Sequence, residues 1–142
     1  MIRVLFLCTG NSARSILAEA LANHDHGQVV EAHSAGSQPV GQVQPGALRV
    51  LAANGVAGSG FSSKSWDAFA PDGATPIGFD WVITLCDSAA GETCPAYLGN
   101  AQRAHWGLPD PARGDITFEA AFETIRARLA EFAANIGQAS GS

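Results

Sequence analysis

The segment from Cys8 to Ser15 combines a thiol, a glycine and an arginine in a spacing that suits attack on a tetrahedral oxyanion. It reads Cys-Thr-Gly-Asn-Ser-Ala-Arg-Ser. Between a strand and a helix, consecutive backbone N–H groups and the helix N-terminus form an anion site, and the Arg14 guanidinium can bind two oxygens at once. The same positive field favours the nucleophilic thiolate of Cys8. The plainer alternative is a small buried cysteine in a tight turn beside a surface arginine.

Three later residues could take part in the same chemistry. Asp110 lies between Pro109 and Pro111, where a carboxylic acid could protonate a leaving group, although an aspartate before a proline is also common in ordinary turns. Cys86 and Cys94 could serve redox chemistry, or could pack as small hydrophobic residues. Seven residues separate the two cysteines, which is not the usual zinc-ligand spacing, so no metal site is expected.

Composition points to one acidic, globular domain. The chain has 142 residues, a formal charge of -5 at pH 7, 46% hydrophobic residues and 15% charged residues. Such a chain can fill one core, and its acidic balance argues against nonspecific binding to nucleic acid. We expect a single domain over residues 1–137, a disordered tail over 138–142, and a monomer. Any anion site must therefore be local.

The apolar start of the chain is too short to cross a membrane. It ends at Leu7, far below the roughly 20 residues that span a bilayer. It also lacks the basic region and cleavage site of a secretory signal, so we expect a cytoplasmic protein with no membrane partner. In that reducing compartment the 3 cysteines are expected to be thiols at rest.

Strand and helix signals alternate along the chain. Short apolar runs predict strands over 2–7, 29–34, 79–85 and 101–106. Helical periodicity predicts helices over 12–24, capped by Ser12, over 45–54 and over 118–136. Residues 58–78 are rich in Gly, Ser and Pro and are predicted to be irregular, with one helical turn over 66–69.

This alternation predicts an α/β, flavodoxin-like three-layer fold. Right-handed crossovers give a four-stranded parallel sheet with helices on both faces, most simply in the order 2-1-3-4. Ligands bind at the carboxyl ends of such strands. Cys8, Cys86 and Asp110 each follow a predicted strand, so all three are expected on one rim.

Several motifs resemble arsenate reductases built on the low-molecular-weight protein tyrosine phosphatase fold. They are the Cys8–Ser15 loop, His-Ser-Ala-Gly at 33–36, Leu-Cys-Asp at 85–87 with Cys-Pro at 94–95, and His-Trp-Gly at 105–107 followed by Pro-Asp-Pro. The resemblance extends from Met1 to about Ile136 and implies reduction of arsenate to arsenite for arsenic detoxification. It makes Cys8 the nucleophile and Asp110 the general acid. The implied oxyanion-binding residues are Thr9, Gly10, Asn11, Ser12, Ala13, Arg14 and Ser15.

Cys86 and Cys94 favour the reductase branch over the phosphatase branch. Reducing pentavalent arsenic takes two electrons, and two thiols that end as a disulfide supply them. Neighbouring strands are about 4.8 Å apart, which allows a Cys8–Cys86 disulfide, and Cys94 can then attack Cys86. Eight positions along a helix span about 12 Å, so a helix between Cys86 and Cys94 would have to unwind. We expect no bound cofactor, but an external reductant: thioredoxin, glutathione with glutaredoxin, or a mycothiol-type thiol.

The chain departs from the family pattern at several positions. Ala13 stands where many relatives have a second loop cysteine, and the spacing of Cys86 and Cys94 is one residue longer than in some thioredoxin-coupled relatives. Ala112 and Arg113 replace the tyrosines typical of the phosphatase branch, and Tyr97 is the only tyrosine. A phosphomonoester hydrolase and a non-catalytic anion-binding domain remain the alternatives.

The resemblance also implies a supporting network behind the loop. It assigns Asn11 to holding the loop and Ser15 to stabilising the Cys8 thiolate, and places Ser34 and Glu19 where some reductases bind a monovalent cation. Lys64, the only lysine, is expected to replace that ion with its ammonium group. His24, His26 and His33 are expected at the surface.

Overall fold

The computed structural model describes residues 2–56, 61–73, 77–85, 101–109, 111, 114 and 116–140. Several residues singled out above lie outside these ranges: Cys86, Cys94, Tyr97, Asp110, Ala112 and Arg113. Cys8 and the loop that follows it lie within them.

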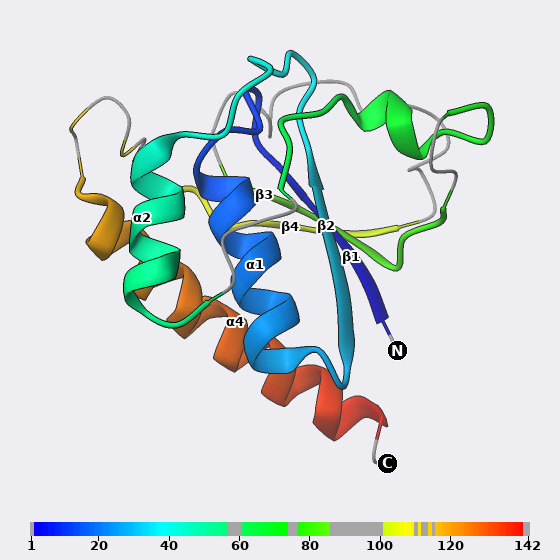
Figure 1. The fold of residues 1–142 in the computed structure, drawn as a ribbon. Helices are drawn as coiled ribbons and strands as arrows, with labels where there is room; N and C mark the ends of the chain where they lie inside the picture. The colour runs from blue at the N-terminus through cyan, green and yellow to red at the C-terminus, as the bar shows by residue number, and fades with distance from the viewer. Residues whose placement is uncertain are drawn as a thin grey trace.

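A four-stranded parallel sheet forms the centre of the molecule (Figure 1). Its strands are β1 (Ile2–Leu7), β2 (Val30–Ala35), β3 (Trp81–Thr84) and β4 (Gln102–His105). The order is β2-β1-β3-β4, which confirms the predicted order. β1 is central because it is the most continuously apolar strand, and Val4 to Leu7 are all at most 1% exposed.

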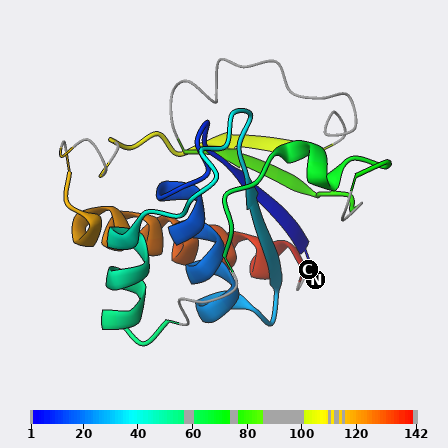
Figure 2. The ribbon, with the colours of Figure 1, turned by 45° about the horizontal axis from the view of Figure 1, so that its top comes forward.

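Three α-helices pack against one face of this sheet: α1 (Arg14–His26), α2 (Pro45–Ala53) and α4 (Phe118–Ser140) (Figure 2). Val4 and Phe6 of β1 meet Leu17 and Leu21 of α1 in the core on that face. Because side chains alternate along a strand, Leu5 and Leu7 point to the other face. There they pack with Phe69 of the short 3-10 helix η1 (Trp66–Phe69). In the described residues, η1 is therefore the helical cover of that second face.

Some element boundaries differ from the sequence predictions. Ser12 does not cap α1, whose N-cap is Ala13 and makes no side-chain cap hydrogen bond. The carbonyl of Ser12 instead accepts a hydrogen bond from the Gln44 amide (2.8 Å), which keeps Ser12 in the loop. β2 begins and ends one residue later than predicted, and β3 and β4 are shorter than predicted.

The closing helix is longer than predicted. α4 runs to Ser140, four residues beyond the predicted helix end at 136. Gly137 favours a helix end at 136, but the helix continues through it into Gln138 and Ala139, which do not oppose helix formation. Within the ranges given above, no helix has the length and apolar character needed to cross a membrane.

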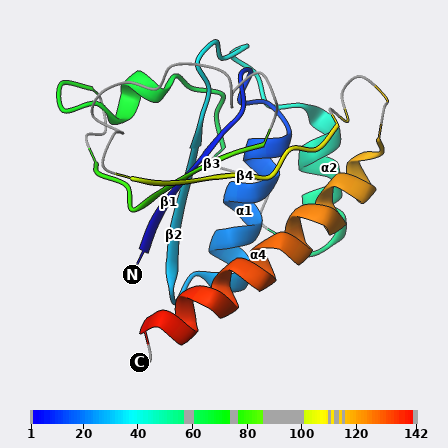
Figure 3. The same ribbon diagram turned by 180° about the vertical axis from the view of Figure 1, so that it is seen from behind.

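The two ends of α1 face opposite ends of the molecule (Figures 1 and 3). Its N-terminus follows the loop at the carboxyl ends of β1 and β2. Its C-terminus lies toward the end of the molecule where both chain termini are found. The predicted reaction centre is therefore at the N-terminal end of α1.

Candidate active site

Cys8 is a buried thiol directly after the central strand. Cys8 is only 6% exposed, and its backbone N–H donates a hydrogen bond to the carbonyl of Ala35 at 3.3 Å. That bond continues the pairing of β1 with β2 by one residue. The rigid sheet therefore fixes the backbone position of the candidate nucleophile.

Three backbone carbonyls of the loop after Cys8 accept hydrogen bonds from the segment that joins β2 to α2. Gln38, Val40 and Gln44 lie between β2 and α2, and their backbone amides donate to the carbonyls of Thr9 (3.0 Å), Gly10 (3.1 Å) and Ser12 (2.8 Å), respectively. A trans peptide points its N–H away from its carbonyl. The N–H groups of Gly10 and Ala13 are therefore turned toward the opposite side of the loop, as an anion site requires.

Asn11 holds the middle of the loop in a bent conformation. Its φ of 47° lies in the left-handed region, which asparagine tolerates better than most residues, and its side chain is fully buried. The amide nitrogen donates to Ser15 Oγ at 2.9 Å, and the amide oxygen accepts from the Lys64 backbone N–H at 2.8 Å. Both polar ends of the buried amide are thus satisfied by residues that flank the loop.

Gly36, at the end of β2, allows the loop to lie close to the sheet. A Cβ atom at this position would lie 2.3 Å from the Thr9 carbonyl oxygen and 2.7 Å from that of Cys8. No side chain fits at those distances from backbone atoms. The close approach of the loop therefore explains why glycine stands at the end of the His-Ser-Ala-Gly motif, a steric requirement that the sequence analysis did not identify.

Arg14 links the loop to the segment that precedes Asp110. Its Nη1 donates to the Leu108 carbonyl at 2.9 Å, and the Leu108 N–H donates to the Leu85 carbonyl at 3.2 Å. Leu108 therefore joins the residue before Cys86 to the candidate anion clamp. Sequence reasoning missed this contact because a backbone carbonyl accepts it, and the leucine side chain gives no sign of it.

The strand register brings the ends of β1, β3 and β4 to one rim. Leu7 pairs with Thr84, and Thr84 pairs with His105. Thr84 Oγ1 lies 2.7 Å from His105 Nδ1, so the two strand ends are also joined through side chains. Positions 86 and 110 follow this rim in the chain, but both lie outside the described residues.

A polar network supports the loop from behind. Ser34 Oγ donates to Glu19 Oε1 at 2.5 Å, and the ammonium nitrogen of Lys64 lies 3.8 Å from the same oxygen. The Lys64 ammonium thus lies near Glu19, which also accepts the Ser34 hydroxyl, while its replacement of a bound cation stays a prediction. Glu19 is mostly buried, with 14% of its side chain exposed.

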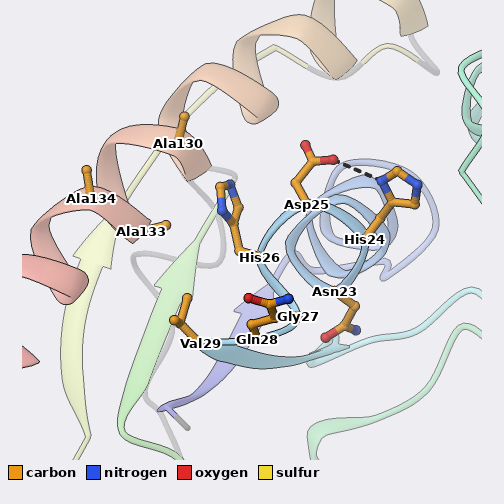
Figure 4. Close-up of a pocket in the computed structure, with 10 residues that line it drawn as sticks. All are labelled: Asn23, His24, Asp25, His26, Gly27, Gln28, Val29, Ala130, Ala133 and Ala134. Atoms are coloured by element: carbon orange, nitrogen blue, oxygen red, sulfur yellow. Dashed lines mark hydrogen bonds and ion pairs between the residues drawn. The ribbon is translucent and has the colours of Figure 1, made fainter.

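A cavity lies at the other end of α1. It has a volume of about 670 Å³ and lies between the end of α1 and the alanines Ala130, Ala133 and Ala134 of α4 (Figure 4). Asp25 lines it and accepts two hydrogen bonds from Arg126, at 2.9 and 3.1 Å. Burial by itself raises the pKa of Asp25, but the hydrogen bonds from Arg126 and His24 outweigh it and leave that pKa below its usual range. The charges there neutralise one another.

The described ranges contain no group of three or more His, Cys, Asp or Glu side chains arranged to hold a metal ion. His24 is half-exposed and contacts Asp25, while His26 lines the cavity at the end of α1. His33 bonds to Glu31 and packs on Phe69 and Phe79. These histidines therefore lie away from the Cys8 loop.

Comparison with known proteins identifies the family. Residues 3–141 match the model for the low molecular weight phosphotyrosine protein phosphatase family, and the chain belongs to that family. An arsenate reductase from Bacillus licheniformis is 37% identical over 131 residues, covering 90% of this chain and 89% of that protein. An arsenate reductase from Bacillus subtilis is 37% identical over 137 residues, covering 92% and 94%.

Solved structures agree with this assignment. The structure described as an arsenate reductase in the phosphate binding state superposes with a TM-score of 0.79 at 26% identity, covering 96% of this chain and 99% of that one. A thioredoxin-dependent arsenate reductase from Corynebacterium glutamicum gives a TM-score of 0.77 at 30% identity, and this chain spans 63% of its length. The predicted fold and the recognised family are both confirmed.

Proposed function

We propose that this chain reduces arsenate to arsenite with Cys8 as the nucleophile. The observation that carries the proposal is the loop itself: a buried thiol at the end of β1, followed by backbone whose carbonyls are turned outward, and then by Arg14. Relatives named arsenate reductase that align over nine-tenths of the chain support the choice of reaction. The loop alone selects an oxyanion, and the remaining cysteines select the chemistry.

The first half of the cycle forms a covalent adduct. Arsenate binds to the loop amides and to the Arg14 guanidinium, which together offset its negative charge. The Cys8 thiolate attacks arsenic and one arsenate oxygen leaves as water, with Asp110 donating a proton to it. When the anion enters, the Arg14 guanidinium either gives up its hydrogen bond to the Leu108 carbonyl for hydrogen bonds to arsenate oxygens, or donates to both.

The second half transfers two electrons through the cysteines. The Cys86 thiolate attacks the Cys8 sulfur, a Cys8–Cys86 disulfide forms, and the electron pair of the broken sulfur–arsenic bond stays with arsenic, which leaves as arsenite. Cys94 then attacks Cys86, which releases the Cys8 thiolate and leaves a Cys86–Cys94 disulfide. An external thiol reductant restores the two thiols.

A thioredoxin-type dithiol is the reductant we propose. The Corynebacterium glutamicum relative is described as thioredoxin-dependent. A terminal disulfide between two cysteines of one chain is also the form of substrate that a dithiol reduces by ordinary exchange. Glutathione with glutaredoxin and mycothiol-type thiols are the competitors to be compared in the assay.

Hydrolysis of phosphomonoesters is the second candidate, because the family to which the chain belongs is named for a phosphatase. Cys8, Arg14 and Asp110 suffice for that reaction. The distal cysteines have no part in it, so the two functions separate by mutation.

Replacement of Cys86 by serine tests the proposal. Arsenate-dependent oxidation of reduced thioredoxin should disappear in Cys86→Ser, because a serine oxygen cannot form the disulfide that releases arsenite. Residual hydrolysis of a small aryl phosphate should survive, since it needs only Cys8. Cys94→Ser should complete one turnover and trap a Cys8–Cys86 disulfide that peptide mapping detects.

Cys8→Ser provides the control, because it should abolish both reactions. An undiminished rate of arsenate reduction in Cys86→Ser would overturn the cysteine relay. Aryl phosphate hydrolysis without any arsenate reduction in the unmodified protein would favour the phosphatase.

A further inference from the structure

The segment Ser62–Trp66 runs along the back of the Cys8–Ser15 loop and contacts both the loop and β2. Its backbone pairs with the end of β2, since the Gly36 N–H donates to the Lys64 carbonyl (2.9 Å) and the Trp66 N–H donates to the Gly36 carbonyl (3.1 Å). The pairing fixes the segment at the side of the loop. The Ser63 side chain reaches the loop, and the Lys64 side chain reaches Glu19 behind it.

Ser63 connects two parts of the site through one hydroxyl group. Its Oγ donates to the Gly10 carbonyl at 2.9 Å and accepts from the Gly41 N–H at 3.1 Å. The first bond holds the Gly10 carbonyl on the outer side of the loop. Since a carbonyl that turned inward would place a partial negative charge against a bound oxyanion, this bond favours the anion-binding conformation.

Lys64 acts on the same loop through charge. Its ammonium nitrogen lies 3.8 Å from Glu19 Oε1, and both side chains are mostly buried, with 26% of Lys64 and 14% of Glu19 exposed. Glu19 is on α1, the helix whose N-terminus supplies the positive field of the loop. An uncompensated carboxylate here would weaken that field, and burial limits how far water can screen it.

We propose that Ser63 and Lys64 are positioning residues for the oxyanion loop, Ser63 through the Gly10 carbonyl and Lys64 through the Glu19 carboxylate. Neither touches the substrate. Both act before any chemical step, so they set the affinity of the loop for a tetrahedral oxyanion more than the rate of electron transfer. The inference deepens the proposed function and rests on it only in naming arsenate as the substrate.

The first experiment compares Ser63→Ala with Ser62→Ala. Ser62 is exposed, and only its backbone carbonyl is used, as acceptor for the Lys64 ammonium at 3.1 Å. Titration of the reduced protein with inorganic phosphate should show an affinity about three- to tenfold lower for Ser63→Ala, the effect expected when the hydrogen bond that holds the Gly10 carbonyl is lost. Ser62→Ala should bind phosphate as the unmodified protein does.

The second experiment separates charge from packing at Lys64. Lys64→Met should lower phosphate affinity by about fivefold, because it leaves Glu19 charged without its cation. Lys64→Arg should stay within about twofold of the unmodified protein. The double variant Glu19→Gln with Lys64→Met should regain most of the lost affinity, since it removes the repelling carboxylate as well.

Steady-state kinetics distinguish a positioning role from a purely structural one, because positioning changes KM for arsenate and leaves kcat nearly unchanged. In Ser63→Ala and Lys64→Met the KM for arsenate should rise by the same factor as the phosphate affinity falls, while kcat stays within about twofold. Equal phosphate affinities in Ser63→Ala and Ser62→Ala, or no recovery in the double variant, would overturn the inference. Because phosphate binding needs no electron transfer, failure of arsenate reduction itself would leave this test intact.

Discussion

The charged side chains at the two ends of helix α1 have different kinds of partner. At the N-terminal end, Arg14 donates to a neutral acceptor, the Leu108 carbonyl, so its positive charge is not cancelled by that contact. At the C-terminal end, the Asp25 carboxylate receives both a bidentate Arg126 and His24. The first contact places a guanidinium beside the candidate anion loop, whereas the second pairs opposite charges and fastens α1 to α4.

The contrast shows why a cavity alone does not make the C-terminal end of α1 the better candidate site. The cavity at the C-terminal end of α1 has volume, but its charged groups are satisfied by one another. The loop at the N-terminal end has backbone carbonyls turned to neighbouring segments and an arginine beside it, an arrangement that can receive an anion. The arrangement of polar groups, rather than volume, therefore marks the candidate site.

Replacement of the arginine at each end should give the clearest contrast. Arg14→Ala should lower kcat/KM for arsenate by about a hundredfold or more, because a charge-assisted bidentate contact with the oxyanion is lost. Arg126→Ala should leave kcat/KM within about twofold. Parallel arsenate reduction assays of the two variants, with circular dichroism to verify folding, measure the difference. Equal losses of activity would show that the two ends do not have separate roles.

The stability effects should run the other way. Asp25→Asn should lower Tm by about 3 °C, because it weakens a partly exposed ion pair worth about 1 kcal/mol. Arsenate reduction should be unchanged in this variant. Thermal unfolding at pH 7 measures the shift, and Glu119→Gln, which alters an exposed pair with Arg49, is the control expected to change Tm by less than about 1 °C. A larger loss in Glu119→Gln than in Asp25→Asn would contradict the assignment.

The same ion pair predicts a pH dependence with a defined sign. The pKa of Asp25 is below its ordinary value of about 3.9 in the folded protein, so its contribution to stability is complete above that value and is lost as the pH falls through the folded pKa. The Tm difference between the unmodified protein and Asp25→Asn should therefore be fully present at about pH 5. It should shrink below about pH 4. A difference that grows as the pH falls below about 4 would show the opposite linkage.

Local signals predicted most of the scaffold. The apolar run at β1 gave the observed bounds Ile2–Leu7, the turn at Trp66–Phe69 was found within an irregular segment, and Pro45 marked the start of α2 because proline suits the first helical turn. Each of these depends on a few adjacent residues. The sheet order followed from the alternation of elements, which is also read from local patterns.

The supports of the loop depended on contacts that no local pattern contains. Ser63 and Gly10 are 53 positions apart, and Arg14 and Leu108 are 94 positions apart. Both contacts end on backbone carbonyls, which every residue has, so the residue types give no signal. Ser12 shows the converse error: serine before a helix predicts a cap, but here the loop uses its backbone carbonyl for a contact with Gln44. The roles of Cys86, Cys94 and Asp110 stay predictions.

The smallest expected effect concerns monovalent cations behind the loop. The Lys64 ammonium lies near Glu19, which also accepts a hydrogen bond from the Ser34 hydroxyl. A cation fixed to the chain is therefore already present at the position where some reductases are expected to bind a monovalent ion. Tm and kcat/KM for arsenate should therefore differ little between potassium and sodium chloride at equal ionic strength, by less than about 1 °C and about 1.5-fold. Choline chloride provides the control for ionic strength alone. A specific stabilisation by potassium of several degrees would show that the site takes an ion in spite of Lys64, and would leave the ammonium as a surface charge beside it.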